Sequence, residues 1–259
     1  NDEDPQFGAD GLDVALLTLP LSAFGEQIGR TSALAYTELP KPPYSGFNLQ
    51  ARFVGDHLVY GNGTGGWDDA MAEPPIALVA SRDGSRDVAR LPLSHGVDQV
   101  EPSAGGAIVI GHAGGKVMFS SLALAGTPAV ISTIVGPEVE PGELFRRASL
   151  LGLDTPGGGL MGVAIRDPRG PADTRLVHGS AGIDLHLLDG LKPQWVGSVL
   201  ATPDERDDSC STSCSRWYDD SQLVVVGERV FALLGYELVE VAIAGGQLRE
   251  IGRVDFFPY

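Results

Sequence analysis

Long apolar runs are absent from this sequence of 259 residues. Uninterrupted apolar stretches, such as residues 107–110 and 223–226, have the length of a β-strand, whereas a membrane-spanning helix needs roughly 18 or more apolar residues. Helical periodicity is also hard to find, because windows with apolar residues at i, i+3, i+4 and i+7 are interrupted by glycine, proline or strand-like alternation. We therefore expect neither a transmembrane segment nor a helical fold.

Basic residues are few, with 18 lysines and arginines against 34 aspartates and glutamates, which gives a formal net charge of -16. A surface of this sign repels the phosphates of nucleic acids and the headgroups of anionic lipids. The composition therefore argues against nucleic acid as a partner.

Cysteine is scarce too, since Cys210 and Cys214 are the only two in the chain. No histidine lies within 20 residues of either, so a zinc site here would lack half of its ligands. We expect an intrachain disulfide between them, with a free thiol pair or a redox couple as the alternatives. Such a short loop would stiffen a local turn and contribute little to the stability of the whole fold.

An initiator methionine is missing, because the sequence starts at Asn1 within an acidic run. We interpret the chain as processed or excised, with any signal peptide already removed. The expected disulfide favours an oxidising compartment, so we expect an extracytoplasmic protein, either secreted, periplasmic or on the cell surface.

Turn-forming residues and apolar residues are both abundant, with 35 glycines, 18 prolines and 43% hydrophobic residues. Apolar runs of four to eight residues recur between glycine, aspartate or asparagine turns, which indicates an all-β protein. We expect an acidic N-terminal segment over residues 1–11, followed by one domain over residues 12–259.

Groups of four strands recur along the chain with a period of roughly 40 to 50 residues, as a propeller blade requires. The clearest groups cover residues 99–134 and 215–251, and looser copies cover 50–93 and 145–200. Strands at 14–19 and 32–36 add an N-terminal half blade. The sequence thus predicts a β-propeller-like fold of about four blades plus a half blade. A two-sheet sandwich or a pair of small β-domains is the alternative.

Such a set of strands cannot close a ring by itself, so we expect it to be part of a larger propeller. The alternative is that the N-terminal strands pair with the last blade around residues 254–257. Within that blade, Val230 and Phe231 are the predicted core residues.

The blade pattern, with residues 227–240 as its last clear example, resembles the bacterial extracytoplasmic β-propeller-repeat proteins. The resemblance implies a binding platform. It covers most of the chain from about residue 47 onward, and it rests on strand pattern, because neither a Trp-Asp signature nor a kelch motif is present.

A few side chains are candidates for a site. His178 and His186 lie on either side of a predicted hairpin and, with Asp184, could hold a metal, although two solvated strand histidines are the simpler interpretation. Acidic loops at residues 68–69, 83–87 and 204–209 could bind calcium or form solvated surface. No other cofactor is expected.

Tryptophan is the most informative aromatic residue here. Trp67 lies in a polar, glycine-rich loop and is the best candidate for a ligand-contact residue, whereas Trp195 and Trp217 occupy strand positions and are expected in the core. The alternative for Trp67 is that its ring folds back over a blade edge.

We favour a non-enzymatic binding or scaffolding protein that acts through loops on one face of the blades. Its partner would be another protein or the remaining part of the same gene product. A propeller-type hydrolase or lyase with a metal site is one alternative, and a structural subunit of a larger assembly is another.

Overall fold

The structure is a computed structural model that describes residues 14–23, 36–43, 49–63, 74–85, 87–138, 148–152, 158–166, 181–202 and 221–256. The regular secondary structure of these residues consists of β-strands and one short 3-10 helix, η1 (Leu21–Ala23). The predicted all-β class is confirmed. In these ranges no helix has the length and apolar character needed to cross a membrane.

Sixteen of the strands form four antiparallel sheets, which follow one another along the chain and which we call blades 1 to 4. Blade 1 consists of β3 (Leu49–Val54), β4 (His57–Asn62), β5 (Ile76–Ser81) and β6 (Val88–Pro92). Blade 2 consists of β7 (Gln99–Ser103), β8 (Gly106–Ala113), β9 (Lys116–Ala123) and β10 (Ala129–Glu138). Blade 3 consists of β11 (Ala148–Gly152), β12 (Gly158–Arg166), β13 (Ala181–Asp189) and β14 (Lys192–Leu200). Blade 4 consists of β15 (Gln222–Val226), β16 (Arg229–Leu234), β17 (Glu237–Ala244) and β18 (Gln247–Asp255).

The N-terminal half blade is also present, as a two-stranded sheet of β1 (Val14–Leu17) and β2 (Tyr36–Leu39). Leu16 and Leu39 from this sheet pack against Tyr60 and Leu78 of blade 1. In the described structure β1 pairs with β2, and β18 pairs with β17. The alternative pairing of the N-terminal strands with the last blade is therefore wrong for the strands described.

Glycine pairs make the tight hairpins that the sequence pattern indicated. Gly114 and Gly115, between β8 and β9, have φ values of 58° and 72°. Gly245 and Gly246, between β17 and β18, have φ values of 60° and 76°. Because residues with a Cβ atom rarely adopt these conformations, glycine lets each strand return directly beside the previous one.

The core lies between the blades, because each sheet buries its two faces against different neighbours. On β8, Val109 belongs to the cluster shared with blade 1, and Ile108 belongs to the cluster shared with blade 3. On β13, Ile183 and Leu185 face blade 4, where they meet Leu234. This alternation follows from the two-residue period of a β-strand, and it defines a propeller-type arrangement.

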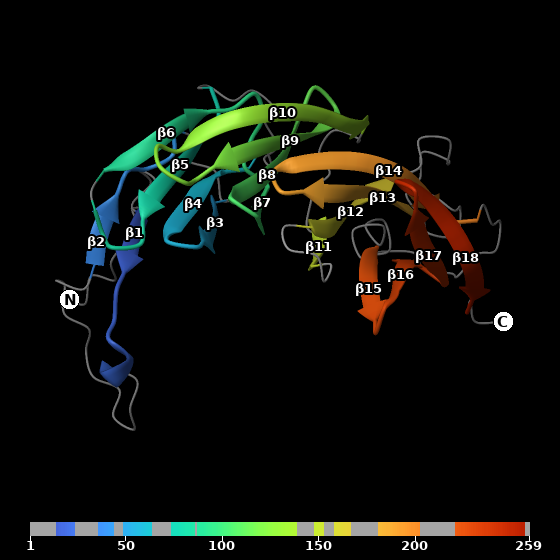
Figure 1. The fold of residues 1–259 in the computed structure, drawn as a ribbon. Helices are drawn as coiled ribbons and strands as arrows, with labels where there is room; N and C mark the ends of the chain where they lie inside the picture. The colour runs from blue at the N-terminus through green and yellow to red at the C-terminus, as the bar shows by residue number, and fades with distance from the viewer. Residues whose placement is uncertain are drawn as a thin grey trace, which may run out of the picture.

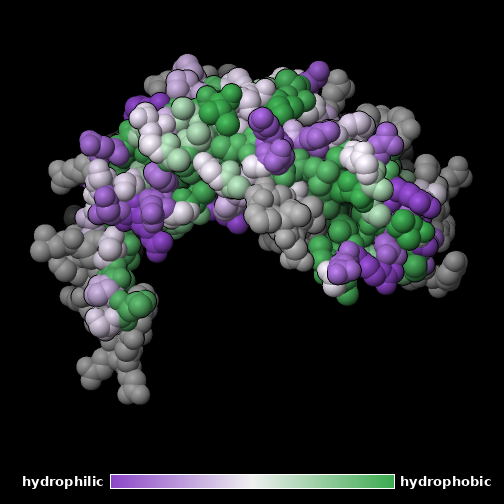
Figure 2. Space-filling model, in the orientation of Figure 1, coloured by the Kyte–Doolittle hydropathy of each residue, from purple (hydrophilic) through white to green (hydrophobic). Residues whose placement is uncertain are grey.

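The blades form an arc in Figure 1, with the first strand of each blade on the concave side and the fourth strand on the convex side. The half blade and blade 4 lie at opposite ends of this arc. In the space-filling view, apolar and polar residues alternate over blade 4 (Figure 2). Most of β18 is exposed, with Val254 62% accessible.

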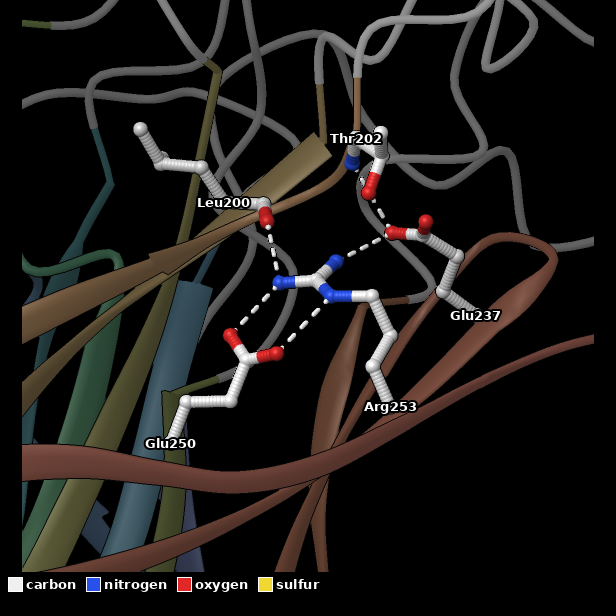
Figure 3. A network of polar contacts seen from close by, with 5 residues as sticks. All are labelled: Leu200, Thr202, Glu237, Glu250 and Arg253. Carbon is white, nitrogen blue, oxygen red and sulfur yellow. Dashed lines mark hydrogen bonds and ion pairs between the residues drawn. The ribbon is translucent and has the colours of Figure 1, made fainter.

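A polar network joins the ends of blades 3 and 4 (Figure 3). Arg253 on β18 donates hydrogen bonds to Glu237 at 2.5 Å, to Glu250 at 2.9 Å and to the carbonyl oxygen of Leu200 at 3.1 Å. Glu237 also accepts a hydrogen bond from the backbone N–H of Thr202, at 2.9 Å. The network therefore fixes the end of β14, which carries Leu200, against blade 4.

The prediction that Phe231 is a core residue of blade 4 is wrong. Ala232 and Leu234 face blade 3 and are buried, whereas Phe231 points to the other face and is only half-buried. There the guanidinium of Arg229 covers the ring, 4.9 Å from its centroid. Val230 is partly buried and packs against the core, so the prediction for it is confirmed in part.

Candidate functional site: a pocket between blades 2 and 3

Several residues singled out in the sequence lie outside the described ranges. These are Trp67, His178, Trp217 and the cysteine pair Cys210 and Cys214, together with the acidic loops at 68–69 and 204–209. Their predicted roles as a ligand contact, a metal ligand, a core residue, a disulfide and calcium loops stay predictions.

The third acidic loop is described in part, and its oxygens are used by the turn itself. Asp83 Oδ1 accepts a hydrogen bond from the backbone N–H of Ser85 at 2.8 Å, and Ser85 Oγ accepts one from the N–H of Asp87 at 3.2 Å. The bond from Ser85 also lowers the pKa of the Asp83 carboxyl. The side chains of Asp83 and Ser85 therefore cap the turn in which they lie.

Two buried histidines differ in how their ring nitrogens are satisfied. The first, His95, has Nδ1 2.7 Å from the carbonyl oxygen of Gly96 and Nε2 2.7 Å from Ser120 Oγ. Since a carbonyl can only accept, Nδ1 carries the proton and Nε2 accepts from Ser120, whose hydroxyl lies 2.9 Å from that of Thr133. Burial lowers the pKa of His95, consistent with this neutral form. Both ring nitrogens of His95 have hydrogen-bond partners, so this network is structural.

The second buried histidine, His186, is not satisfied. Only 4% of the residue is exposed, and its Nε2 has no hydrogen-bond partner among the described residues. Burial lowers its pKa to about 4, so the ring is neutral at pH 7. Its ring packs against Phe119 of blade 2, with ring centroids 4.8 Å apart and the ring planes inclined by 53°. Because an unpaired buried nitrogen costs free energy, His186 is the strongest indication of a ligand site in this part of the chain.

The neighbours of His186 are set by the strand pairing of β13. Asp184 and His186 are two positions apart and share one face, and their partners on β14 are Ser198 and Trp195. Three positions separate Ser198 from Trp195, so a regular strand would place them on opposite faces. A register shift leaves Val196 as an extra residue and brings both onto the face of Asp184.

Gly197 makes this bulge possible. Its φ is 147°, and a Cβ atom at this position would lie 2.8 Å from the Cβ atom of Leu248 on blade 4. Only glycine combines this conformation with so close an approach of β14 to β18.

The bulge also explains why Trp195 is not in the core. Its side chain is turned to the mouth of the pocket and is 60% exposed, so the prediction of a core residue is wrong. His186 pairs with Met161 on β12 and with Trp195 on β14, and the other end of the predicted hairpin, at His178, lies outside the described residues.

Asp184 lies at the centre of this group of side chains. Its carboxylate accepts a 2.5 Å hydrogen bond from Ser198 Oγ and a second from the side chain of Trp195. Burial raises its pKa, and the two hydrogen bonds offset part of that rise. Among the described residues Asp184 forms no ion pair, so a buried acidic group faces the pocket without a cation beside it.

The pocket itself has a volume of about 470 Å³ and lies between β10 of blade 2 and the outer strands of blade 3. This volume is typical of small-molecule sites, which run from roughly 300 to 1,000 Å³. Most of its lining is apolar, and the polar side chains Asp184, His186 and Ser198 converge from blade 3. The lining residues are Ile134, Val135, Gly136, Pro137, Ile165, Asp184, His186, Pro193, Trp195, Ser198 and Leu200.

The wall from blade 2 depends on a second irregularity, at the end of β10. The pairing of β10 with β9 shifts register between Val135 and Glu138. Within that shift, a Cβ atom on Gly136 would lie 2.7 Å from the ring of Phe119. Glycine therefore lets β10 pass close to the same ring that packs against His186.

The hydrogen bonds of this site do not activate Ser198 as a nucleophile. A serine nucleophile needs a hydrogen bond to a base such as histidine, but Ser198 Oγ donates to Asp184 instead. No cluster of three or more histidine, cysteine, aspartate or glutamate side chains suited to a metal occurs in the described residues. The side chains present can accept hydrogen bonds and enclose an apolar body.

The fold and site together define a β-propeller-type protein with a pocket between two blades. No protein-family model and no curated protein matches the sequence. Among solved structures, it is 14% identical to a protein proposed to be a gluconolactonase, over 83% of this chain and 63% of that one, with a TM-score of 0.33. It is 11% identical to the β-propeller domain of the Trilobed protease from Pyrococcus furiosus, over 83% of this chain and 72% of that one, with a TM-score of 0.35. AztD from Citrobacter koseri is 14% identical, over 86% and 63% of the two chains, with a TM-score of 0.29.

These similarities transfer no function. The chain spans just under two thirds of the first of these structures, and each TM-score lies below 0.5. The propeller-type assignment therefore rests on the four successive four-stranded sheets and the way they pack.

Proposed function

We propose that this chain is an extracytoplasmic binding protein that takes a ligand with an apolar body into the pocket between blades 2 and 3. The observation that carries this proposal is the buried, unpaired Nε2 of His186 in a pocket of about 470 Å³. A bound group that donates or accepts a hydrogen bond there would remove the cost of that unpaired nitrogen.

The pocket lining supports a ligand that is mainly apolar. Ile134 and Val135 are exposed on β10, and Trp195 is exposed on β14, although apolar side chains of this size usually gain by burial. A ligand between these strands would cover all three. Aromatic side chains at a pocket mouth often serve this purpose, because their large surface is buried at low entropic cost.

The proposed location outside the cytoplasm rests on the sequence. The two cysteines, for which we expect a disulfide, and the resemblance to extracytoplasmic propeller-repeat proteins favour it. A disulfide between Cys210 and Cys214 is part of the same proposal, and its direct test is thiol titration.

The neutral aromatic alcohol 2-phenylethanol is a suitable first probe. In a variant with Trp67→Phe and Trp217→Phe, Trp195 is the remaining tryptophan, so its fluorescence reports on the pocket mouth. We expect a saturable change of Trp195 emission with one-to-one stoichiometry. The absence of any saturable binding would contradict the proposed function.

Two substitutions on β10 locate the binding. Val135→Trp would fill the pocket from an exposed position and should abolish binding of the alcohol in isothermal titration, a measurement that the added tryptophan does not disturb. Ile131→Trp is the matched control, since Ile131 is similarly exposed on the same strand but does not line the pocket. Equal binding by both variants would place the probe elsewhere.

A scaffolding role is the second candidate, and the open end of the arc favours it. Each blade interface described buries apolar residues on both sides, yet Val226 and Val254 of blade 4 are more than half exposed. We propose that a further blade covers this face, supplied by the same gene product or by a partner protein. A monodisperse, compact monomer of 27.1 kDa with cooperative unfolding would contradict this role.

A further inference from the structure

We propose that the ligand of the pocket between blades 2 and 3 carries a protonated amine, which pairs with Asp184 while its apolar body lies between β10 and Trp195. This inference rests on the proposed function and names the chemical class of the ligand.

The first reason is the position of the carboxyl group. Asp184 lines the pocket, only 4% of it is exposed, and no cation among the described residues forms an ion pair with it. Buried carboxylates in proteins are usually paired, because an isolated charge in apolar surroundings is costly. A cationic ligand would supply the missing partner.

The second reason is that the carboxylate is held in place and still has acceptor capacity. Ser198 and Trp195 each donate one hydrogen bond to Asp184, whereas an ionised carboxylate offers about four lone-pair sites. Both donors also favour the ionised form. A primary ammonium group has three N–H donors and can use the remaining sites.

The third reason is that the other described residues that line the pocket add no positive charge. His186 is the nearest other titratable group on the same face of β13, and burial holds its pKa at about 4, so it is neutral at pH 7. The formal net charge of -16 also raises the local concentration of cations around the protein. An anionic ligand would meet a carboxylate and no cation among the described lining residues.

Protonated 2-phenylethylamine and 2-phenylethanol form a matched pair of probes. They have the same aromatic body, and both can donate a hydrogen bond, so their difference in affinity reports on the charge. Isothermal titration at pH 7 should show that the ammonium binds roughly tenfold or more tightly than the alcohol, as expected for a buried charge pair.

Asp184→Asn tests the role of the carboxylate at nearly constant shape. The variant should bind both probes with similar affinity, since the amide keeps the hydrogen bond from Ser198 but removes the charge. Asp189→Asn is the control, because Asp189 is an exposed acid on the same strand and outside the pocket. The Asp189 variant should keep the wild-type preference.

The salt dependence needs no variant. A preference that comes from Asp184 should persist in 0.5 M NaCl, whereas attraction by the net surface charge should be screened. Equal affinity of the wild type for both probes, or a preference that persists in Asp184→Asn, would overturn the inference while the alcohol still reports binding. If neither probe binds, the proposed function fails as well.

Discussion

Lowering the pH from 7 to 5 should reduce the free energy of unfolding by about 2 kcal/mol through His186 alone. Burial lowers the pKa of this histidine from 6.5 to about 4 in the folded protein. As the pH falls below 6.5, the unfolded chain takes up a proton at this position, but the folded chain stays neutral until about pH 4. The contribution to stability is therefore complete above pH 6.5 and is lost as the pH falls toward 4, where the total loss is about 3 kcal/mol.

The assay is urea unfolding of wild type and His186→Leu at pH 7, 6 and 5, followed by circular dichroism. Leucine keeps an apolar contact with Phe119 and removes the titrating group. Other buried groups also make stability depend on pH. Burial raises the pKa values of Asp184 and Glu101, so these acids stabilise the folded state as the pH falls. Burial lowers the pKa of His95, so this histidine destabilises the folded state as the pH falls. These contributions are shared by both proteins and cancel in the difference.

The diagnostic quantity is therefore the difference between the two pH profiles. Wild type should lose about 2 kcal/mol more than His186→Leu between pH 7 and pH 5. Parallel profiles would mean that His186 is accessible to water in solution. In that case the unpaired nitrogen would lose its meaning as a sign of a ligand site.

Three further predictions test the fold and its local features. Leu234→Ala should lower the free energy of unfolding by about 2–5 kcal/mol, whereas Phe231→Ala should lower it by about 1–2 kcal/mol because the ring of Phe231 is half-buried. Equal losses in urea unfolding would contradict the burial of Leu234. Gly197→Ala should lower the free energy of unfolding by about 1–3 kcal/mol and shift the emission of Trp195, because the added Cβ atom meets Leu248. An unchanged melting curve would mean that the bulge does not need glycine. Thiol titration of the unfolded, unreduced protein should find no free cysteine, whereas two titrated thiols would remove the predicted Cys210 and Cys214 disulfide.

The blades were predictable because their signals are local. Strand-length apolar runs separated by glycine pairs gave the four strands at residues 99–134, and the observed strands β7 to β10 cover the same segment. The last blade is similar, since the predicted strands at 223–226 and 229–234 correspond to β15 and β16. In the half blade, the strand predicted at 14–19 corresponds to β1. Of the second strand, predicted at 32–36, the described residues include Tyr36, which is the first residue of β2.

The pocket was not predictable, because it depends on irregular pairing and on packing between blades. The sequence identified Asp184 and His186 as neighbours, but it could not show that Trp195 and Ser198 lie opposite them, since this requires the extra residue at Val196. The opposite wall begins at Ile134, about 50 positions earlier in the chain. The one available signal was Gly197, because a glycine in the interior of a strand often marks a bulge.

The pocket and the open end of the arc are independent features. The walls of the pocket come from blades 2 and 3, and each of these blades packs against a described neighbour on its other face. Among the described residues, blade 4 reaches the pocket indirectly, through Leu248 beside Gly197 and through Arg253, which donates a hydrogen bond to the carbonyl oxygen of Leu200 (Figure 3). A further blade against Val226 and Val254 would cover a different surface. Ligand binding should therefore not require such a partner, so a partner that altered the affinity of the pocket would have to act through β18.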